Sequence, residues 1–190
     1  MNADGSPVRV READAEVIDS DRLAWVADQL EIRDVYHRYC RGIDRRQFEL
    51  VRSCYHADAT DNHGEYVGTV DGLIDYLRVR LARFERTMHS TSNILIELDG
   101  DRARGEAYVL VHHLMPAWRN LPRRDFVAAG RYVDDFERRN GVWRIARRVC
   151  VFEWTRLEPV ADSPYRLTET HLMGRADGDD PVFASSLLDL

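Results

Sequence analysis

Two side chains in this sequence, Asp44 and His89, are of the types that transfer protons as a pair. Asp44 closes an expected helix within the stretch YCRGIDRR (39–46), and His89 opens an expected strand. A carboxylate that accepts a hydrogen bond from one imidazole nitrogen leaves the other free to act as a base. Spacing alone equally allows Asp44 to cap its helix or pair with a nearby arginine, and His89 to be an ordinary strand histidine.

Tyr39 and His113 are further candidates for the same chemistry. A phenol five residues before Asp44 could donate a hydrogen bond to a substrate oxygen, or it could be a core tyrosine. Of His112 and His113, one must point inward on a strand. The inward histidine shares its face either with Ala107, Val109 and Val111, a set that ends in His113, or with Tyr108 and Leu110. An inward histidine could be an acid, a proton shuttle or a hydrogen-bonded interior residue.

The segment HADATDNH (56–63) contains possible metal ligands, since imidazole and carboxylate suit several transition metals. Its composition is more typical of a turn, so we expect no metal site. Motifs for dinucleotides, for the P-loop, for zinc proteases and for serine hydrolases are missing from the sequence. All 27 basic residues are arginines, which excludes a Schiff-base lysine. Nucleotide-dependent, serine-hydrolase and Schiff-base mechanisms are therefore not expected.

The three cysteines, Cys40, Cys54 and Cys150, form no CxxC pair, and we interpret them as buried small hydrophobic residues. Four Arg-Arg pairs lie scattered between the expected elements, which favours solvated edges over a phosphate-binding groove. They begin at residues 45, 123, 138 and 147.

Composition indicates one compact domain. The chain has 190 residues, 44% of them hydrophobic, with a formal charge of −6 and a pI near 5.6. This charge argues against a nucleic-acid partner. No apolar run approaches the roughly 18 residues of a membrane span, and the first residues lack the apolar centre of a signal peptide. We expect a cytoplasmic protein with no membrane partner.

Helical periodicity dominates the first part of the chain. A long amphipathic helix should begin near residues 19–21 and end near 44–46, and a shorter one should cover about 47–55. Residues 56–68 are rich in turn formers, with a short strand expected at 65–67. A further helix fits residues 70–84.

The second part alternates with a period of two. Strands are expected at residues 89–100, 101–118, 126–138 and 142–159, joined in part by an Asp-Gly and an Asn-Gly turn. Helices followed by an antiparallel meander predict an α+β fold, in which a curved sheet packs on the N-terminal helices and encloses a pocket. Residues 1–18 should be a mobile arm, 19–159 the cone-shaped domain and 160–190 an extended tail.

Five stretches of the chain, in order, carry a family resemblance. They are LEIRDVYHRYCRGIDRR, YHADAT, EYVGTVDGLIDYL, TMHSTSNILIELDGDRA and GRYVDDFERRNGVWRIARR, which together cover about residues 20–158. In this layout the chain resembles the SnoaL-like branch of the nuclear transport factor 2-like superfamily. The resemblance implies a cone-shaped α+β fold with an apolar pocket, often dimeric or trimeric.

Within that superfamily the chain looks most like hexachlorocyclohexane dehydrochlorinase, scytalone dehydratase and bile-acid dehydratases, lyases with a His–Asp dyad. The resemblance places the dyad at Asp44 and His89 and adds Tyr39 as a third catalytic residue. It implies substrate contacts from His113 and Arg148, and we also expect Tyr132 and Asn93 to bind substrate.

These observations predict a cofactor-free lyase or isomerase acting on an apolar, oxygenated ring compound such as a steroid or polyketide. A polyketide-type cyclase or hydroxylase on the same scaffold stays open. So does a protein without activity, either a small-molecule binder or the small subunit of a ring-hydroxylating dioxygenase, because the superfamily contains all of these. We expect a homotrimer or homodimer.

Overall fold

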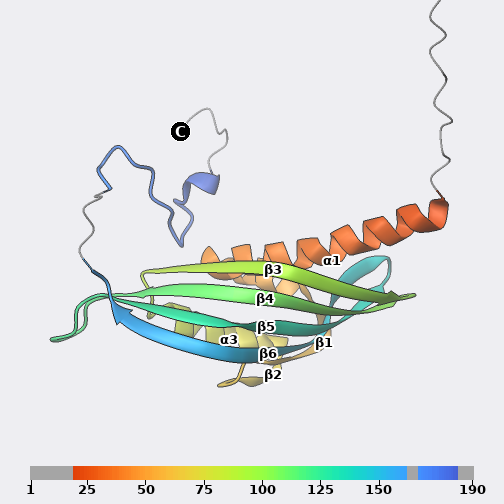
Figure 1. Ribbon diagram of the computed structural model, residues 1–190, viewed down its shortest axis with the longest axis horizontal. Coiled ribbons are helices and arrows are strands. Elements are labelled where there is room, and N and C mark those ends of the chain that lie inside the picture. Colours follow the sequence, from red (N-terminus) through yellow and green to blue (C-terminus); the bar gives the residue numbers. More distant parts are fainter. Residues whose placement is uncertain (1–18, 162–166, 184–190) are drawn as a thin grey trace, which may run out of the picture.

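The computed structural model describes residues 19–161 and 167–183. Within them, three helices and a six-stranded, curved and unclosed sheet form an α+β fold, as the sequence predicts. The strand order is β2-β1-β6-β5-β4-β3. Figure 1 shows the four long strands running side by side, with α1 lying along the β3 end of the sheet. The predicted arm, residues 1–18, lies outside the described residues.

The helices occupy the first half of the chain, as the 3.6-residue periodicity predicts. Helix α1 spans Ser20–Asp44 and begins at Asp19, whose side chain accepts a hydrogen bond from the backbone N–H of Asp21. Helix α2 is shorter than predicted, and α3 ends three residues before the predicted limit. These two helices span Phe48–Ser53 and Val70–Leu81.

The four long strands form an antiparallel meander close to the predicted boundaries. They are β3 (Arg86–Asp99), β4 (Arg102–Met115), β5 (Arg124–Arg139) and β6 (Val142–Pro159). The turns have the backbone that their residues favour: φ is 58° at Gly100, 53° at Asn140 and 75° at Gly141. Left-handed φ values are accessible to glycine and asparagine, and the predicted Asp-Gly and Asn-Gly turns are both confirmed.

The prediction of a turn-rich segment at residues 56–68 was wrong. Residues Tyr55–Asn62 form strand β1, and Val67–Thr69 form β2 in place of the short strand expected at 65–67. Strand β1 pairs in parallel with β6 and antiparallel with β2. Its residues have poor strand propensity, so the strand depends on hydrogen bonds from a partner far along the chain.

Two irregularities decide which side chains face the helices. In β3 the register with β4 shifts between Ser92 and Leu95, and in β6 the register with β5 shifts at Ala146. An extra residue in one strand reverses the alternation of side chains beyond it. Ile145 lies on the inner face, so strict alternation would place Arg147 there and Arg148 outside. The second shift reverses this and turns Arg148 and Cys150 to the inner face.

A single core lies between the sheet and the helices. Large side chains that are at most 2% exposed come from both layers, among them Tyr36 of α1, Leu73 of α3 and Phe136 of β5. None of the helices in the described ranges is long and apolar enough to cross a membrane. The described part of the tail includes a short 3-10 turn, Pro181–Phe183, and returns to the C-terminal end of α1, where Asp180 pairs with Arg45 at 3.1 Å.

Candidate functional site

The Asp44 carboxylate and the His89 imidazole are hydrogen-bonded, with 2.7 Å between Asp44 Oδ1 and His89 Nδ1. Two further donors hold the carboxylate: the Thr87 hydroxyl contacts Oδ1 at 2.9 Å, and the backbone N–H of His89 donates to Oδ2 at 2.9 Å. An ionised carboxylate only accepts hydrogen bonds, so His89 Nδ1 carries a proton and Nε2 presents a lone pair. The side chains of His89 and Asp44 are 8% and 12% exposed.

Asp44 turns inward because the arginines beside it have other partners. Arg45 pairs with Asp180, and the guanidinium of Arg46 donates to the backbone carbonyls of Leu81 and Phe84 at the end of α3. The arginines in YCRGIDRR suggest a solvated surface, but these contacts give Arg45 and Arg46 partners other than Asp44. They leave the Asp44 carboxylate free to meet His89.

A cavity of about 540 Å³ opens between α1, α3 and the inner face of the sheet, and His89 lines it. Its walls are mainly apolar, from side chains such as Leu77, Val109 and Phe126. Cavities of this size and character bind small organic ligands. Tyr39, His113 and Tyr132 also line it, so the structure brings these three together with His89 as the sequence predicts.

His113 has no hydrogen-bond partner on either ring nitrogen among the described residues, although the residue is only 9% exposed. Its ring stacks against Phe84 at 4.3 Å between centroids and lies 5.4 Å from the His89 ring. Burial and the neighbouring His89 lower the pKa of His113 to about 3. His113 is therefore neutral at physiological pH, which argues against the predicted role as an acid that starts the reaction in its protonated form. A buried polar ring without a partner is costly, so a polar group of a ligand would stabilise it.

The low pKa of His113 makes a prediction about stability. In the unfolded chain its pKa is about 6.5. Between pH 6.5 and 3 the unfolded state binds a proton that the folded state does not, so His113 reduces stability as the pH falls. Replacing it with leucine should reduce the loss of unfolding free energy between pH 7 and 5 by about 1–2 kcal/mol. Urea unfolding at both pH values measures this. The exposed His112→Leu variant should keep the wild-type loss, and equal losses in all three proteins would contradict the prediction.

Arg148 is not a pocket residue, and the prediction that it binds substrate was wrong. It is fully buried and pairs with Asp134 through two hydrogen bonds, of 2.8 and 2.6 Å. Its guanidinium lies over two tyrosine rings that meet at 80°, 4.2 Å from the centroid of the Tyr39 ring and 4.1 Å from that of the Tyr132 ring. The expectation of solvated Arg-Arg pairs also fails here, because the shift at Ala146 turns Arg148 inward and leaves Arg147 exposed.

Asn93 is exposed on β3, outside the residues that line the cavity, so it does not bind substrate as predicted. Its φ of 47° places it in the left-handed region, within the shift between Ser92 and Leu95. Asparagine tolerates this backbone better than most residues. Asn93 therefore accommodates the irregular backbone of β3. This irregularity keeps both His89 and Ile96 on the inner side of the sheet.

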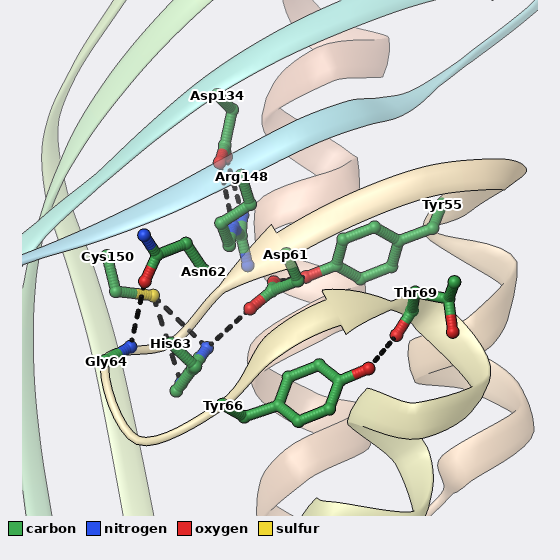
Figure 2. Close-up of polar contacts among 10 residues, drawn as sticks. All are labelled: Tyr55, Asp61, Asn62, His63, Gly64, Tyr66, Thr69, Asp134, Arg148 and Cys150. Atoms are coloured by element: carbon green, nitrogen blue, oxygen red, sulfur yellow. Dashed lines mark hydrogen bonds and ion pairs between the residues drawn. The ribbon is translucent and has the colours of Figure 1, made fainter.

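A second group of polar side chains, missed by the sequence prediction, lies on the cavity wall formed by β1 and β6. His63 Nδ1 is 3.1 Å from Asp61 Oδ1 and 3.2 Å from Cys150 Sγ (Figure 2). The prediction that all three cysteines are buried holds for Cys40 and Cys54, whereas Cys150 is partly exposed and lines the cavity. The sequence indicated this group only through His63. Because a turn was expected at residues 56–68, nothing suggested that His63 would lie beside Cys150.

The residues of HADATDNH that could bind a metal have other partners. His56 Nε2 donates to the backbone carbonyl of Glu137 at 2.8 Å, and Asp58 pairs with Arg139 at 2.6 Å. In the described ranges, no group of three or more histidine, cysteine, aspartate or glutamate side chains is arranged to hold a metal ion.

Comparisons with known proteins agree with this architecture. The SnoaL-like domain family matches residues 25–149. Hexachlorocyclohexane dehydrochlorinase 1 of Sphingobium indicum is 28% identical over 153 residues, which is 77% of this chain and 94% of that protein. An uncharacterized protein of Mycobacterium tuberculosis is 29% identical over 132 residues, 67% of this chain and 86% of that protein.

Solved structures show the same fold at lower identity. A hexachlorocyclohexane dehydrochlorinase of type 3 from Novosphingobium barchaimii superposes with a TM-score of 0.65 at 23% identity, covering 77% of this chain and 99% of that one. A proposed scytalone dehydratase from Novosphingobium aromaticivorans has a TM-score of 0.62 at 20% identity, covering 73% and 96%. Because the SnoaL-like match spans well over half of the 190 residues, this chain belongs to the SnoaL-like family of the nuclear transport factor 2-like superfamily.

Proposed function

We propose that this protein is a cofactor-free lyase that eliminates a hydroxyl or halide from an apolar, oxygenated ring compound such as a steroid or polyketide. The observation that carries the proposal is the Asp44–His89 pair at the wall of the apolar cavity, with His89 Nδ1 bonded to the carboxylate at 2.7 Å. Relatives named as a dehydrochlorinase and a dehydratase support a lyase of this type.

The reaction begins at His89 Nε2, which removes a proton from a carbon next to a carbonyl or beside the leaving group. The electron pair of the broken C–H bond forms the new C=C bond, and the bond to the leaving group breaks. Asp44 stabilises the imidazolium, because its Oδ1 already accepts the hydrogen bond from Nδ1. A departing hydroxyl takes the proton from His89 and leaves as water, whereas a halide leaves as an anion.

Tyr39 and His113 contribute polar groups in a mostly apolar cavity. The phenol of Tyr39 donates a hydrogen bond to the developing oxyanion or to the departing hydroxyl, an interaction that is stronger where water is excluded. Neutral His113 bonds a substrate oxygen through one of its unpartnered nitrogens. Its low pKa keeps a second positive charge away from His89 while the imidazolium forms.

The test is turnover of a panel of hexachlorocyclohexane, β-hydroxy ketosteroids and hydroxylated polyketide rings. Chloride release and the ultraviolet absorbance of a conjugated ketone report the two kinds of elimination. The chain supplies a matched control, because His112 and Asp125 form an exposed His–Asp pair with 3.1 Å between Nδ1 and Oδ2. His89→Gln should lose turnover, and His112→Gln should keep it.

Three outcomes would contradict the proposal. Equal turnover by wild type and His89→Gln would remove the pair from the reaction. A native mass spectrum showing a panel compound bound but chemically unchanged after prolonged incubation would instead assign the protein as a small-molecule binder. Association with a metal-carrying partner chain, seen by light scattering, would indicate a dioxygenase subunit.

A further inference from the structure

The group formed by Asp61, His63 and Cys150 lies in the cavity wall but has no part in the elimination. Asp61 is the next-to-last residue of strand β1, His63 directly follows that strand, and Cys150 lies on β6. Parallel pairing of β1 with β6 aligns Asn62 with Val149 and so brings residues that are 87 positions apart into contact. Figure 2 shows the His63 ring between the Asp61 carboxylate and the Cys150 sulfur.

Asp61 is fixed as an acceptor for His63. It is fully buried, and its Oδ2 accepts a hydrogen bond from the Tyr55 hydroxyl at 2.7 Å. Its Oδ1 faces His63 Nδ1 at 3.1 Å, so the proton on Nδ1 points toward the carboxylate and the nearby sulfur. This is the arrangement of a histidine that is oriented by a carboxylate and contacts a thiol.

Charges around the group favour a protonated His63. Burial by itself lowers the pKa of His63, but the contacts with Cys150 and Asp61 raise it to about 10. From β5 and β6, Asp134 and Arg148 neutralise one another. At the cavity mouth, Glu65 pairs with Arg80 at 2.8 Å in the same way, so the Asp61 carboxylate is the acidic group left to face the His63 ring. An imidazolium beside a thiol stabilises the thiolate.

We propose that Cys150 is a nucleophilic thiol of this cavity that adds to α,β-unsaturated carbonyl compounds, with His63 as its proton partner and Asp61 as the group that positions His63. The thiolate sulfur attacks the β-carbon, so a C–S bond forms while the C=C π bond breaks. Its electron pair moves onto the carbonyl as an enolate, which takes the proton from the His63 imidazolium at the α-carbon. The product is a saturated thioether ketone, and no oxidant or further reactant is needed.

The ligand class follows from the cavity. Its walls are apolar, which suits a ring enone, and Cys150, Phe126 and Val109 line the same space. The other two cysteines are internal controls, because burial raises the pKa of Cys40 to about 12 and that of Cys54 to about 11. Both thiols stay protonated and enclosed in the native protein.

The experiment treats the full chain with N-ethylmaleimide, and separately with cyclohex-2-enone, and follows the intact mass and the labelled peptide with time. Wild type should gain one adduct, at Cys150. At about pH 6 it should react at least about tenfold faster than glutathione, since a free thiol with a pKa near 8.5 is almost wholly protonated there. Its rate should change little between about pH 6 and 8, whereas the free-thiol rate rises steeply.

Variants separate the parts of the proposal. Cys150→Ser should gain no adduct, and His63→Gln should label at about pH 6 at least about tenfold more slowly than wild type. His112→Gln, on the outer surface, and His89→Gln should both label at the wild-type rate. The last variant keeps this inference separate from the lyase, because Cys150 labelling needs no turnover.

The proposal fails if wild-type Cys150 labels no faster than glutathione at about pH 6, or if His63→Gln leaves the rate unchanged. It also fails if the single adduct maps to Cys40 or Cys54. A variant that does not fold is recognised by labelling at Cys40 and Cys54, and the pH profile of the wild-type protein then decides the question alone.

Discussion

Replacing Asp44 with asparagine should lower kcat for the elimination by roughly 10²–10⁴-fold while the unfolding midpoint stays nearly unchanged. The substitution alters one atom of the carboxylate and leaves its volume the same. The loss should exceed what removal of one hydrogen bond would cause, because the pattern of donors around Asp44 forces the His89 ring into the wrong tautomer.

The geometry explains that tautomer. The backbone N–H of His89 can only donate, and it contacts Asp44 Oδ2 at 2.9 Å. An asparagine must place its single oxygen there, so its NH₂ group faces His89 Nδ1, where the carboxylate now accepts at 2.7 Å. Nδ1 then becomes the acceptor and Nε2 carries the proton. A protonated Nε2 cannot remove a proton from substrate, and the positive charge of the imidazolium loses its counter-charge.

Two measurements check this result. Steady-state kinetics give the loss in kcat, and ¹⁵N chemical shifts of the imidazole report the change of tautomer without any substrate. The matched control is Asp125→Asn, which alters the exposed pair with His112 and should leave kcat unchanged. Wild-type activity in Asp44→Asn would rule out the Asp44–His89 pair as the reacting base.

The largest loss of stability should come from replacing Asp134 with alanine, which we expect to lower the free energy of unfolding by about 3–5 kcal/mol. Arg148 and Asp134 are both fully buried, and the guanidinium lies over the rings of Tyr39 and Tyr132. Burial lowers the pKa of Arg148, but the Asp134 carboxylate more than offsets this, so the guanidinium stays charged. Without Asp134 that buried charge loses both of its hydrogen bonds to a carboxylate.

Removing both charges should lower the free energy of unfolding far less than removing one. The double variant Arg148→Met, Asp134→Leu replaces the pair with apolar side chains and should recover most of the lost stability, because the desolvation of two charges also disappears. Urea unfolding of wild type, Asp134→Leu, Arg148→Met and the double variant closes a double-mutant cycle and gives the coupling free energy. If Asp134→Ala and the double variant were equally unstable, loss of packing and not an unpaired charge would be the cause.

Elements with a strong local signal could be predicted from the sequence. Helix α1 and the four long strands follow periodicities of 3.6 and two, and the turn at Asn140 has the backbone that its residues favour. The hydrogen bond between Asp44 and His89 is also as the resemblance implies. His113 faces inward because no register shift interrupts β4 between Ala107 and His113.

The failures share a physical cause, which is that distant pairing decides the local structure. Strand β1 has the composition of a turn and becomes a strand because β6 pairs with it. The insertion at Ala146 reverses the alternation, so Arg148 enters the core, and no pattern in the neighbouring residues indicates it. Asn93 matches a family motif, but its side chain lies outside the cavity. Without the course of β1, sequence reasoning could not bring His63 to Cys150.

The parallel pairing of β1 with β6 also constrains how this protein is made. While the ribosome is still synthesising β6, β1 can pair only with β2, so one of its edges stays open. His63 and Cys150 are 87 positions apart, which at typical synthesis rates is a delay of roughly 4–17 s. Closing so long a loop is slow compared with forming the hairpins of β3 to β6. One wall of the cavity therefore forms last, and a nascent chain exposes an unpaired strand edge for several seconds before the ligand site exists.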